Sequence, residues 1–183
     1  EHLPSARHVA YHEARAAGGA GLIIFESIRV AKQSLGRPQG VGGYRRECIE
    51  PFRAVADAVH RHGVPLFGQV IHLGRQVPGD FERTVGWGPS PVRWSSTAAM
   101  PHAIHRDEMD EVLKAHVTTA RNLLEAGFDG FEVHLGHGHL LQQFLSPASN
   151  QRDDDYGGSE ANRRRFPLEV LRAVRDEVGP DVC

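Results

Sequence analysis

The sequence predicts an α/β fold of the (β/α)8 barrel class, and three observations support this prediction. Segments with the apolar spacing of amphipathic helices alternate with short apolar runs, which is the pattern of βαβ units. The apolar runs are nearly uninterrupted, as expected for strands buried on both faces of a parallel sheet. A long insertion rich in Gly, Pro and Ser, residues 73–105, follows the second run, and the active-site loops of barrels follow the carboxyl ends of strands.

Four segments carry the helical pattern, and each ends at a glycine suited to a left-handed C-cap. In the third, Met109, Val112, His116 and Leu123 belong to one stripe with the spacing i, i+3, i+4, so we expect a helix packed on one side. The four segments are residues 5–19, 47–63, 106–127 and 159–179. In the acidic run 153–158 that precedes the fourth, we expect a turn, with Ser159 capping the helix.

Short strands follow the helices, at 20–27, 64–72 and 128–136, and a further strand would start near Val182. Three strands and the start of another make about half of a barrel. An open half-barrel leaves unpaired strand edges, so we expect the remaining strands to be missing from this chain or supplied by another copy. The chain opens on Glu1 and stops at Cys183, and we therefore interpret residues 1–183 as a partial barrel domain truncated at both ends.

Composition and charge point to a small-molecule partner. The 183 residues carry a formal net charge of −2, and Lys and Arg are scattered, so we expect neither nucleic acid nor a membrane surface as a partner. The chain also lacks an apolar run of the roughly 20 residues that a membrane span needs. Two distant cysteines, Cys48 and Cys183, suggest no disulfide framework. We expect a globular protein of a reducing compartment, the cytoplasm.

Three histidines follow the third strand within six residues: His134, His137 and His139. If the strand ends near His134 and Gly136 lets the chain turn, the first two can converge at the barrel mouth, with His139 approaching from the rim. Three interpretations remain open on these residues alone. The histidines are tolerated in a glycine-rich turn, they bind a metal such as zinc, or two of them donate hydrogen bonds to one oxygen.

Longer motifs narrow the choice. The segment "GFDGFEVHLGHGHLLQQFLSPASNQRDDDYGGSEANRRRF", residues 127–166, closely resembles the signature of the old yellow enzyme family of FMN-dependent oxidoreductases. The segment "GQVIHLGR", residues 68–75, is similar to the family's Gln-Leu-x-His-x-Gly-Arg motif, and "GGAGLIIFES" to its second strand. Matches this long, in the expected order over nearly the whole chain, are specific.

The resemblance implies an FMN-binding TIM barrel, of which this chain covers about strands 2 to 4 and the start of 5. It also implies roles for four residues. Gln69 would bond the pyrimidine edge of the flavin, and Ser27 would contact the ring system through its backbone. His134 and His137 match the pair that holds the substrate's carbonyl oxygen, which stabilises the negative charge developing there.

Two positions depart from the family pattern. His139 stands in "HGHL" where many members place a tyrosine that protonates the α-carbon of the substrate. A histidine could still act as the general acid there, so the replacement leaves the proton-transfer step open. Ile71 occupies a position where the family varies between bulky aromatic and small residues, and it predicts an intermediate apolar wall of the substrate pocket.

The function implied is transfer of hydride from NAD(P)H, through FMN, to the activated C=C of an α,β-unsaturated carbonyl compound. Amine dehydrogenases related to trimethylamine dehydrogenase, N-demethylases and 2,4-dienoyl-CoA reductases share the resemblance. Those larger relatives carry a 4Fe-4S cluster, which would lie beyond this chain. A histidine at position 134 favours carbonyl substrates. From other classes, a zinc-binding barrel hydrolase and a non-catalytic fragment are alternatives, and a homo-oligomer is compatible with the sequence.

Overall fold

The computed structural model describes residues 2–77 and 85–183, so residues 78–84 of the predicted insertion lie outside the described residues. Helices and strands alternate as the sequence predicts. The helices are α1 (Ala6–Ala17), α2 (Ile49–His60), α3 (Arg106–Glu125), α4 (Leu140–Leu145) and α5 (Glu160–Val178), with 3-10 turns η1 (Lys32–Ser34) and η2 (Arg46–Cys48). The strands are β1 (Ile23–Arg29), β2 (Val41–Gly42), β3 (Leu66–Ile71), β4 (Trp87–Gly88), β5 (His102–Ala103) and β6 (Gly130–Val133).

The main sheet is parallel and has the strand order β2-β1-β3-β6. The three long predicted strands are therefore neighbours, with β3 in the centre. No strand is formed at residues 182–183, where the sequence predicts the start of one, but the backbone N–H of Phe131 on β6 donates to the carbonyl oxygen of Cys183 at 2.9 Å. β2 was not expected from the sequence, since two paired residues leave no apolar run to recognise.

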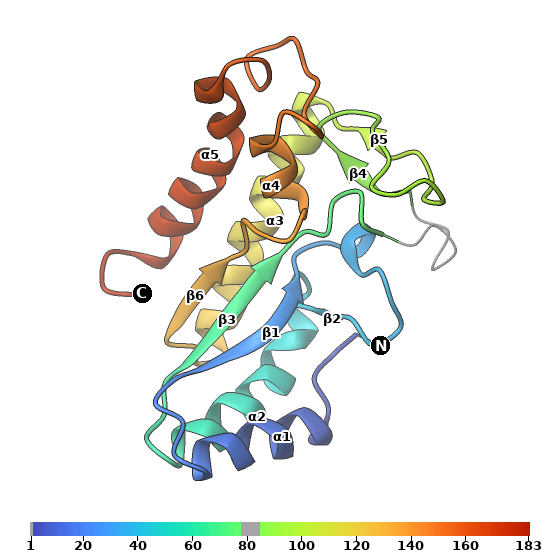
Figure 1. Ribbon diagram of the computed structural model, residues 1–183. Helices are drawn as coiled ribbons and strands as arrows, with labels where there is room; N and C mark the ends of the chain where they lie inside the picture. Colours follow the sequence, from blue (N-terminus) through green and yellow to red (C-terminus); the bar gives the residue numbers. More distant parts are fainter. Residues whose placement is uncertain (1, 78–84) are drawn as a thin grey trace.

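Helices cover one face of this sheet. In Figure 1, α2 and α3 lie behind β1, β3 and β6, and no described helix covers the face turned toward the reader. The alternation of the strands agrees, because Phe25 points toward the helices and is fully buried, whereas its neighbour Ile24 is 40% exposed. The open face is the side that would be the interior of a complete barrel.

The main core is aromatic at its centre. Phe25 of β1 contacts Phe52 of α2, with ring centroids 5.3 Å apart, and Phe52 contacts Phe128 at 5.5 Å. These rings hold both layers at the amino end of the strands and leave the carboxyl ends for polar groups. A second core lies between α3, α4 and α5, where Phe144 and Phe166 pack at 4.7 Å.

The predicted helix ends agree with the structure. Gly63, Gly127 and Gly179 all have positive φ angles, of 69°, 93° and 82°, which only glycine adopts cheaply. Ser159 caps α5, because its side chain accepts a hydrogen bond from the backbone N–H of Asn162 at 3.2 Å. These local predictions are confirmed.

The insertion is not entirely a loop. It contains two short strands, β4 and β5, which pair in parallel. Trp87 is opposite His102, and Gly88 is opposite Ala103. Strand pairs this short depend on contacts with the rest of the fold, so the local sequence gave no sign of them.

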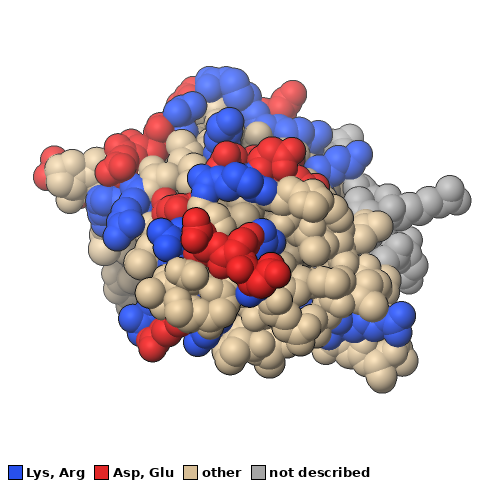
Figure 2. Space-filling model, turned by 90° about the horizontal axis from the view of Figure 1, so that it is seen from above, with Lys and Arg blue, Asp and Glu red and all other residues tan. Residues whose placement is uncertain are grey.

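Among the described residues, none of the helices combines the length and apolar character that a bilayer crossing requires. On the face seen in Figure 2, basic and acidic side chains are interspersed and form no continuous stripe among the described residues.

Candidate active site

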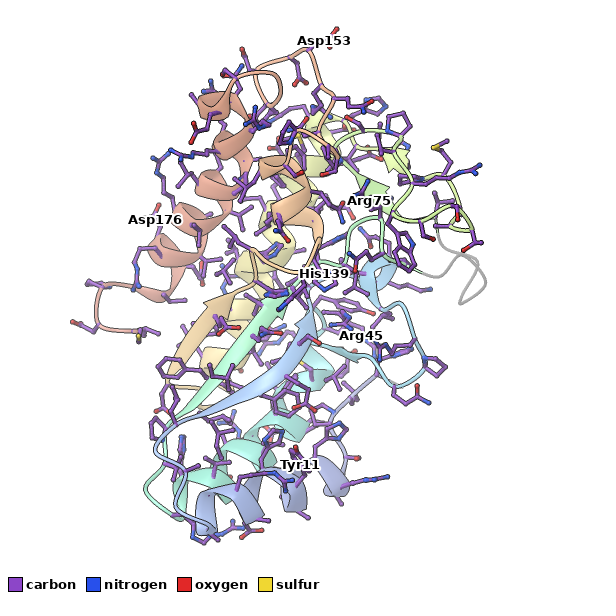
Figure 3. All side chains as sticks on the ribbon, in the orientation of Figure 1. Tyr11, Arg45, Arg75, His139, Asp153 and Asp176 are labelled. Carbon is purple, nitrogen blue, oxygen red and sulfur yellow. The ribbon has the colours of Figure 1, made fainter. Side chains whose placement is uncertain are left out.

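The predicted site residues gather at the carboxyl ends of three neighbouring strands. Ser27 lies on β1, Gln69 on β3, and His134 directly follows β6. The backbone N–H of His134 donates to the carbonyl oxygen of Val70 at 3.0 Å, so β6 and β3 remain paired up to this histidine. Figure 3 labels His139, which lies near this end of the sheet, between α4 and the strands.

Gln69 pairs with an acidic neighbour on the next strand. The parallel register places Gln69 opposite Glu132, and the Gln69 side-chain amide donates to Glu132 Oε1 at 2.5 Å. Both residues are half-buried on the open face. This pairing was not predicted from the sequence, although the register of two parallel strands that end together indicates it.

His134 and His137 converge as predicted, but the turn that joins them differs from expectation. His137 itself has φ 56° and Gly138 has φ 72°, while Gly136 is not in the left-handed region. A left-handed conformation is uncommon for a residue with a β-carbon. The turn is held from outside, because the Gln76 side chain donates to the carbonyl oxygens of His137 and Gly138 at 3.0 and 3.1 Å.

The two imidazoles hydrogen-bond to each other. His137 Nδ1 lies 3.1 Å from His134 Nε2, and the ring centroids are 5.0 Å apart. One nitrogen of this pair must donate and the other must accept, so two neutral rings in this arrangement retain one further N–H donor between them. Burial, and secondly the charge of His137, lowers the pKa of His134, which favours its neutral form.

His139 lies at the start of α4, as the N-cap residue of that helix. Its ring centroid is 5.2 Å from that of His134. Its Nδ1 is buried and has no hydrogen-bond partner. Burial, with a further contribution from His134, lowers the pKa of His139 to about 4, so the ring is neutral at pH 7. The structure thus brings all three histidines together.

A buried arginine, which was not predicted as a site residue from the sequence, contacts the backbone of Ser27. Arg29 is 5% exposed. Its guanidinium Nη1 donates to the Ser27 carbonyl oxygen at 3.0 Å, while its Nε has no hydrogen-bond partner. Burial and the nearby Arg37 lower the pKa of Arg29 to about 10. The available signal was a cation at the end of β1, directly after the apolar residue Ile28.

Ser27 lies at an irregularity of β1. The register between β1 and β3 shifts between Phe25 and Ile28, so that Ser27 has no partner residue on β3. Ser27 lines a shallow pocket together with Arg29 and Gln39. Ile71, the predicted pocket wall, is only 2% exposed and packs with Leu73 and Val77. Its role in a substrate pocket therefore stays a prediction.

In the part of the chain that the structure describes, the side chains best placed to share a metal ion are not those of the histidine trio. Among the described residues, one group of three His, Cys, Asp or Glu side chains has its ligand atoms within 4.8 Å of one another, and it lies at the start of α3. His134, His137 and His139 are not part of it. The arrangement instead offers neutral hydrogen-bonding groups at the mouth of a partial barrel.

Parallel strands, helices on one face and polar side chains at the carboxyl ends of the strands are the arrangement expected for part of a (β/α)8 barrel, and the comparisons with known proteins agree. Residues 2–183 match the model of the NADH:flavin oxidoreductase / NADH oxidase family. The chain belongs to this family.

Individual relatives cover the chain almost completely. It is 38% identical over 189 residues to 12-oxophytodienoate reductase 1 from Oryza sativa subsp. japonica, covering 97% of this chain and 48% of that protein. It is 40% identical to an NADH oxidase from Thermoanaerobacter brockii, covering 97% of this chain and 28% of that protein. The chain therefore spans about half or less of the length of these relatives.

Solved structures also match almost the whole of this chain. An old yellow enzyme homologue from Zymomonas mobilis is 30% identical with a TM-score of 0.90, and the match covers 97% of this chain and 52% of that one. Morphinone reductase is 29% identical with a TM-score of 0.93, covering 100% of this chain and 53% of that one. The prediction that this chain is part of a TIM barrel of the old yellow enzyme family is thus confirmed.

The residues present fit the FMN that the family implies. The pyrimidine edge of a flavin alternates hydrogen-bond acceptors with a donor, and the half-buried Gln69 amide offers both functions. Ser27, which has no partner residue in the register with β3, offers backbone groups beside it. The unpartnered Nε of buried Arg29 adds a donor next to Ser27.

Proposed function

We propose that the protein containing this chain transfers hydride from NAD(P)H to the activated C=C of α,β-unsaturated carbonyl compounds, with FMN as its cofactor. The observation that carries this proposal is the convergence of His134 and His137, 3.1 Å apart, at the mouth where β1, β3 and β6 end. FMN, held by Gln69 and Ser27, would supply the hydride-transfer chemistry that links NAD(P)H to the β-carbon of the substrate. The residues of this chain then account for binding, polarisation and protonation.

Gln69 and Ser27 hold the cofactor in this proposal. The Gln69 amide is already oriented by Glu132 on the neighbouring strand, and a side chain fixed in advance loses less entropy when it binds. Arg29 fixes the Ser27 carbonyl oxygen. Ile71 closes an apolar wall of the pocket.

His134 and His137 polarise the substrate. A carbonyl oxygen between the rings would replace their mutual hydrogen bond with one N–H from each ring, after one ring rotates. Apo geometry of this kind commonly tightens only when ligand binds. Two donors aimed at the oxygen stabilise the negative charge that develops as hydride reaches the β-carbon. The lowered pKa of His134 suits a neutral donor that keeps its N–H in place.

His139 is the candidate for protonating the α-carbon. It lies next to His134, and its buried Nδ1 is not engaged by another group. An imidazolium is a stronger acid than a tyrosine hydroxyl, but a pKa of about 4 makes that form scarce at pH 7. Proton transfer should therefore limit the rate at neutral pH.

The first experiment is an absorption spectrum of the purified full-length protein. We expect the flavin bands of one FMN per chain, bleaching on anaerobic addition of NADH or NADPH, and recovery when 2-cyclohexenone is added. A colourless protein that does not take up added FMN would contradict the proposal. Bleaching by trimethylamine instead of NAD(P)H would favour the amine-oxidising alternative.

The second experiment tests the histidine pair. His134→Ala and His137→Ala should each weaken binding of p-hydroxybenzaldehyde, whose phenolate mimics the polarised oxygen, by about tenfold or more, since each removes a hydrogen bond to a charged group. Flavin content should not change. The matched control is His62→Ala, a histidine beyond the end of α2. Phenol affinity unchanged in both site variants would contradict the assigned roles.

A further inference from the structure

A cluster of metal-ligating side chains lies outside the mouth, at the junction of β5 and α3. It consists of His102, His105 and Glu108, spaced three residues apart in the sequence. One ligand atom from each side chain lies within 4.8 Å of the other two. His102 belongs to β5, His105 is the N-cap of α3, and Glu108 lies in the first turn of that helix.

The three side chains face a common centre. His102 Nε2 lies 2.8 Å from each of the two carboxylate oxygens of Glu108. The His102 and His105 rings are neighbours, with centroids 5.6 Å apart and planes inclined at 75°. The His102 ring thus contacts the Glu108 carboxylate directly, and a ring nitrogen of His105 lies within 4.8 Å of the same group.

Helix capping explains only part of this arrangement. Glu108 accepts a hydrogen bond from the backbone N–H of His105 at 2.7 Å, which is one half of a capping box. An imidazole has two nitrogens, so His105 can serve the cap through one and a ligand through the other. Capping gives no reason for His102, on a different element, to face the same carboxylate.

The backbone that carries the cluster is anchored on both sides. The N–H of His102 donates to the Gly86 carbonyl oxygen at 2.8 Å, and the N–H of Ile104 to that of Gly88 at 3.0 Å. The guanidinium of Arg152 donates to the Ile104 carbonyl oxygen at 2.7 Å. Ile104 itself is fully buried. A ligand set held in this way needs only side-chain rotation to close on an ion.

We propose that His102, His105 and Glu108 bind one Zn²⁺ ion, with the fourth position left to water. Two imidazole nitrogens and one carboxylate oxygen are a donor set that zinc uses with bonds of about 2.0–2.2 Å. Such bonds bring ligand atoms to within roughly 4 Å of one another, which is a short movement from the present separation. His102 and Glu108 are half-buried and His105 is exposed, so the ion can enter from solvent.

The local charge balance is compatible with a cation. The positive end of the α3 dipole opposes a cation, but Asp107 and Glu108 both lie in the first turn. Arg106, the nearest cation in sequence, pairs with Asp110 at 3.0 Å.

Zinc at this position would join β5 to the start of α3. The ring of Trp87 on β4 lies 6.2 Å from the ring of His102 and 6.1 Å from the ring of buried His72, measured between ring centroids. Residues on β4 and β5 would lose freedom when the ion binds. The protein should therefore gain stability as zinc is added, in proportion to the logarithm of the zinc concentration above the dissociation constant.

The test is calorimetric titration of ZnCl₂ into the chelator-treated full-length protein. We expect one ion per chain with a dissociation constant on the order of a micromolar. Three variants remove one ligand each: His102→Asn, His105→Ser, which keeps a capping oxygen, and Glu108→Gln, which keeps the capping acceptor. Each should weaken zinc binding by about 100-fold, since even residues that only support a ligand are worth about 10- to 100-fold.

Two controls locate the ion. His62→Ser removes an unrelated histidine, and the double variant His134→Ala/His137→Ala removes the pair at the mouth; both should bind zinc as the parent protein does. Co²⁺ should give absorption beyond the flavin bands in the parent protein and not in Glu108→Gln. Absence of stoichiometric zinc binding would overturn the proposal, as would binding that survives all three ligand variants or is lost in the double variant. Flavin content and the melting temperature without zinc verify that each variant is folded.

Discussion

His134, His137 and His139 share a short glycine-containing segment, yet each has a different environment. His137 is exposed and has a left-handed backbone, His134 is half-buried at a strand end, and His139 begins a helix with one ring nitrogen buried and unpartnered. Burial is the main cause of the lowered pKa of both His134 and His139. Because all three residues are histidines, their different surroundings must account for the different roles proposed for them: hydrogen bonding for His134 and His137, and proton transfer for His139.

A prediction at the residue scale concerns the proton donor. With the pKa of His139 at about 4, only roughly one ring in a thousand is protonated at pH 7, and the fraction rises about tenfold for each unit of pH removed. If the imidazolium is the acid, oxidation of the reduced flavin by 2-cyclohexenone should accelerate from pH 8 to pH 5. His139→Phe should abolish this slope, and His139→Tyr should give a rate nearly independent of pH. Stopped-flow absorbance measures these rates.

The control for this prediction is the other half-reaction. Reduction of the flavin by NADPH needs no α-carbon protonation, so its rate in His139→Phe should stay close to that of the parent protein. A parent enzyme whose enone half-reaction does not respond to pH would exclude His139 as the acid.

At the scale of elements, the turn before α5 contains a position where two backbone segments approach so closely that only glycine fits. Tyr156 and Gly157 belong to the acidic run 153–158, and Asn150 spans the turn by donating to the carbonyl oxygens of Phe144 and Tyr156 at 2.8 and 2.7 Å. Gly157 packs directly on the backbone of Arg152, so that a β-carbon there would overlap the Arg152 carbonyl oxygen. The acidic run thus forms a turn, as predicted.

A prediction at this scale is that Gly157→Ala destabilises the protein by roughly 1–3 kcal/mol, because the added methyl group must push a backbone segment aside. The matched control is Gly21→Ala, since no heavy atom lies within 4 Å of a β-carbon built at Gly21. Urea denaturation of the full-length proteins measures both free energies of unfolding. Equal stability of the two variants would show that the turn adapts without cost.

At the scale of the whole molecule, two histidines from different elements are buried together. His72 follows β3 and is 2% exposed, and His116 of α3 is fully buried. Burial, with the charges of His116 and Arg29, lowers the pKa of His72 to about 3. Burial also lowers the pKa of His116 to about 4, although the Val112 carbonyl oxygen works in the opposite direction. Each has a side-chain Nε2 without a partner.

Because these two histidines are buried as neutral rings, we predict that the fold loses stability in acid. Both rings are neutral in the fold, whereas in the unfolded chain they bind protons near pH 6.5. Their contribution to stability is complete above pH 6.5 and is lost as the pH falls from there toward 4. His116→Leu should therefore lose roughly 2 kcal/mol less stability than the parent between pH 7.5 and 4.5. Urea midpoints at the two pH values measure the difference, with His62→Leu as a control. If His116→Leu and the parent protein lose the same free energy of unfolding between the two pH values, protonation of His116 is not the cause of the acid sensitivity.

The sequence by itself determined the alternation of helices and strands, the glycines that end the helices, the Ser159 cap and the family. Apolar periodicity and capping chemistry act over one or two turns, so a single chain segment carries all the information they need. The motif that contains His134 and His137 also identified the pair, and their convergence followed from the strand end that precedes them.

Only the tertiary structure decided which groups meet from distant segments. The partnership of Gln69 with Glu132, the burial of Arg29 under Ser27 and the approach of His102 to Glu108 depend on strand register, desolvation and the pairing of β4 with β5. Register and burial are set by segments tens of residues apart, so no local pattern encodes them. The same reason explains the low pKa of His139, since burial by the surrounding fold lowers it more than any neighbour in the sequence does.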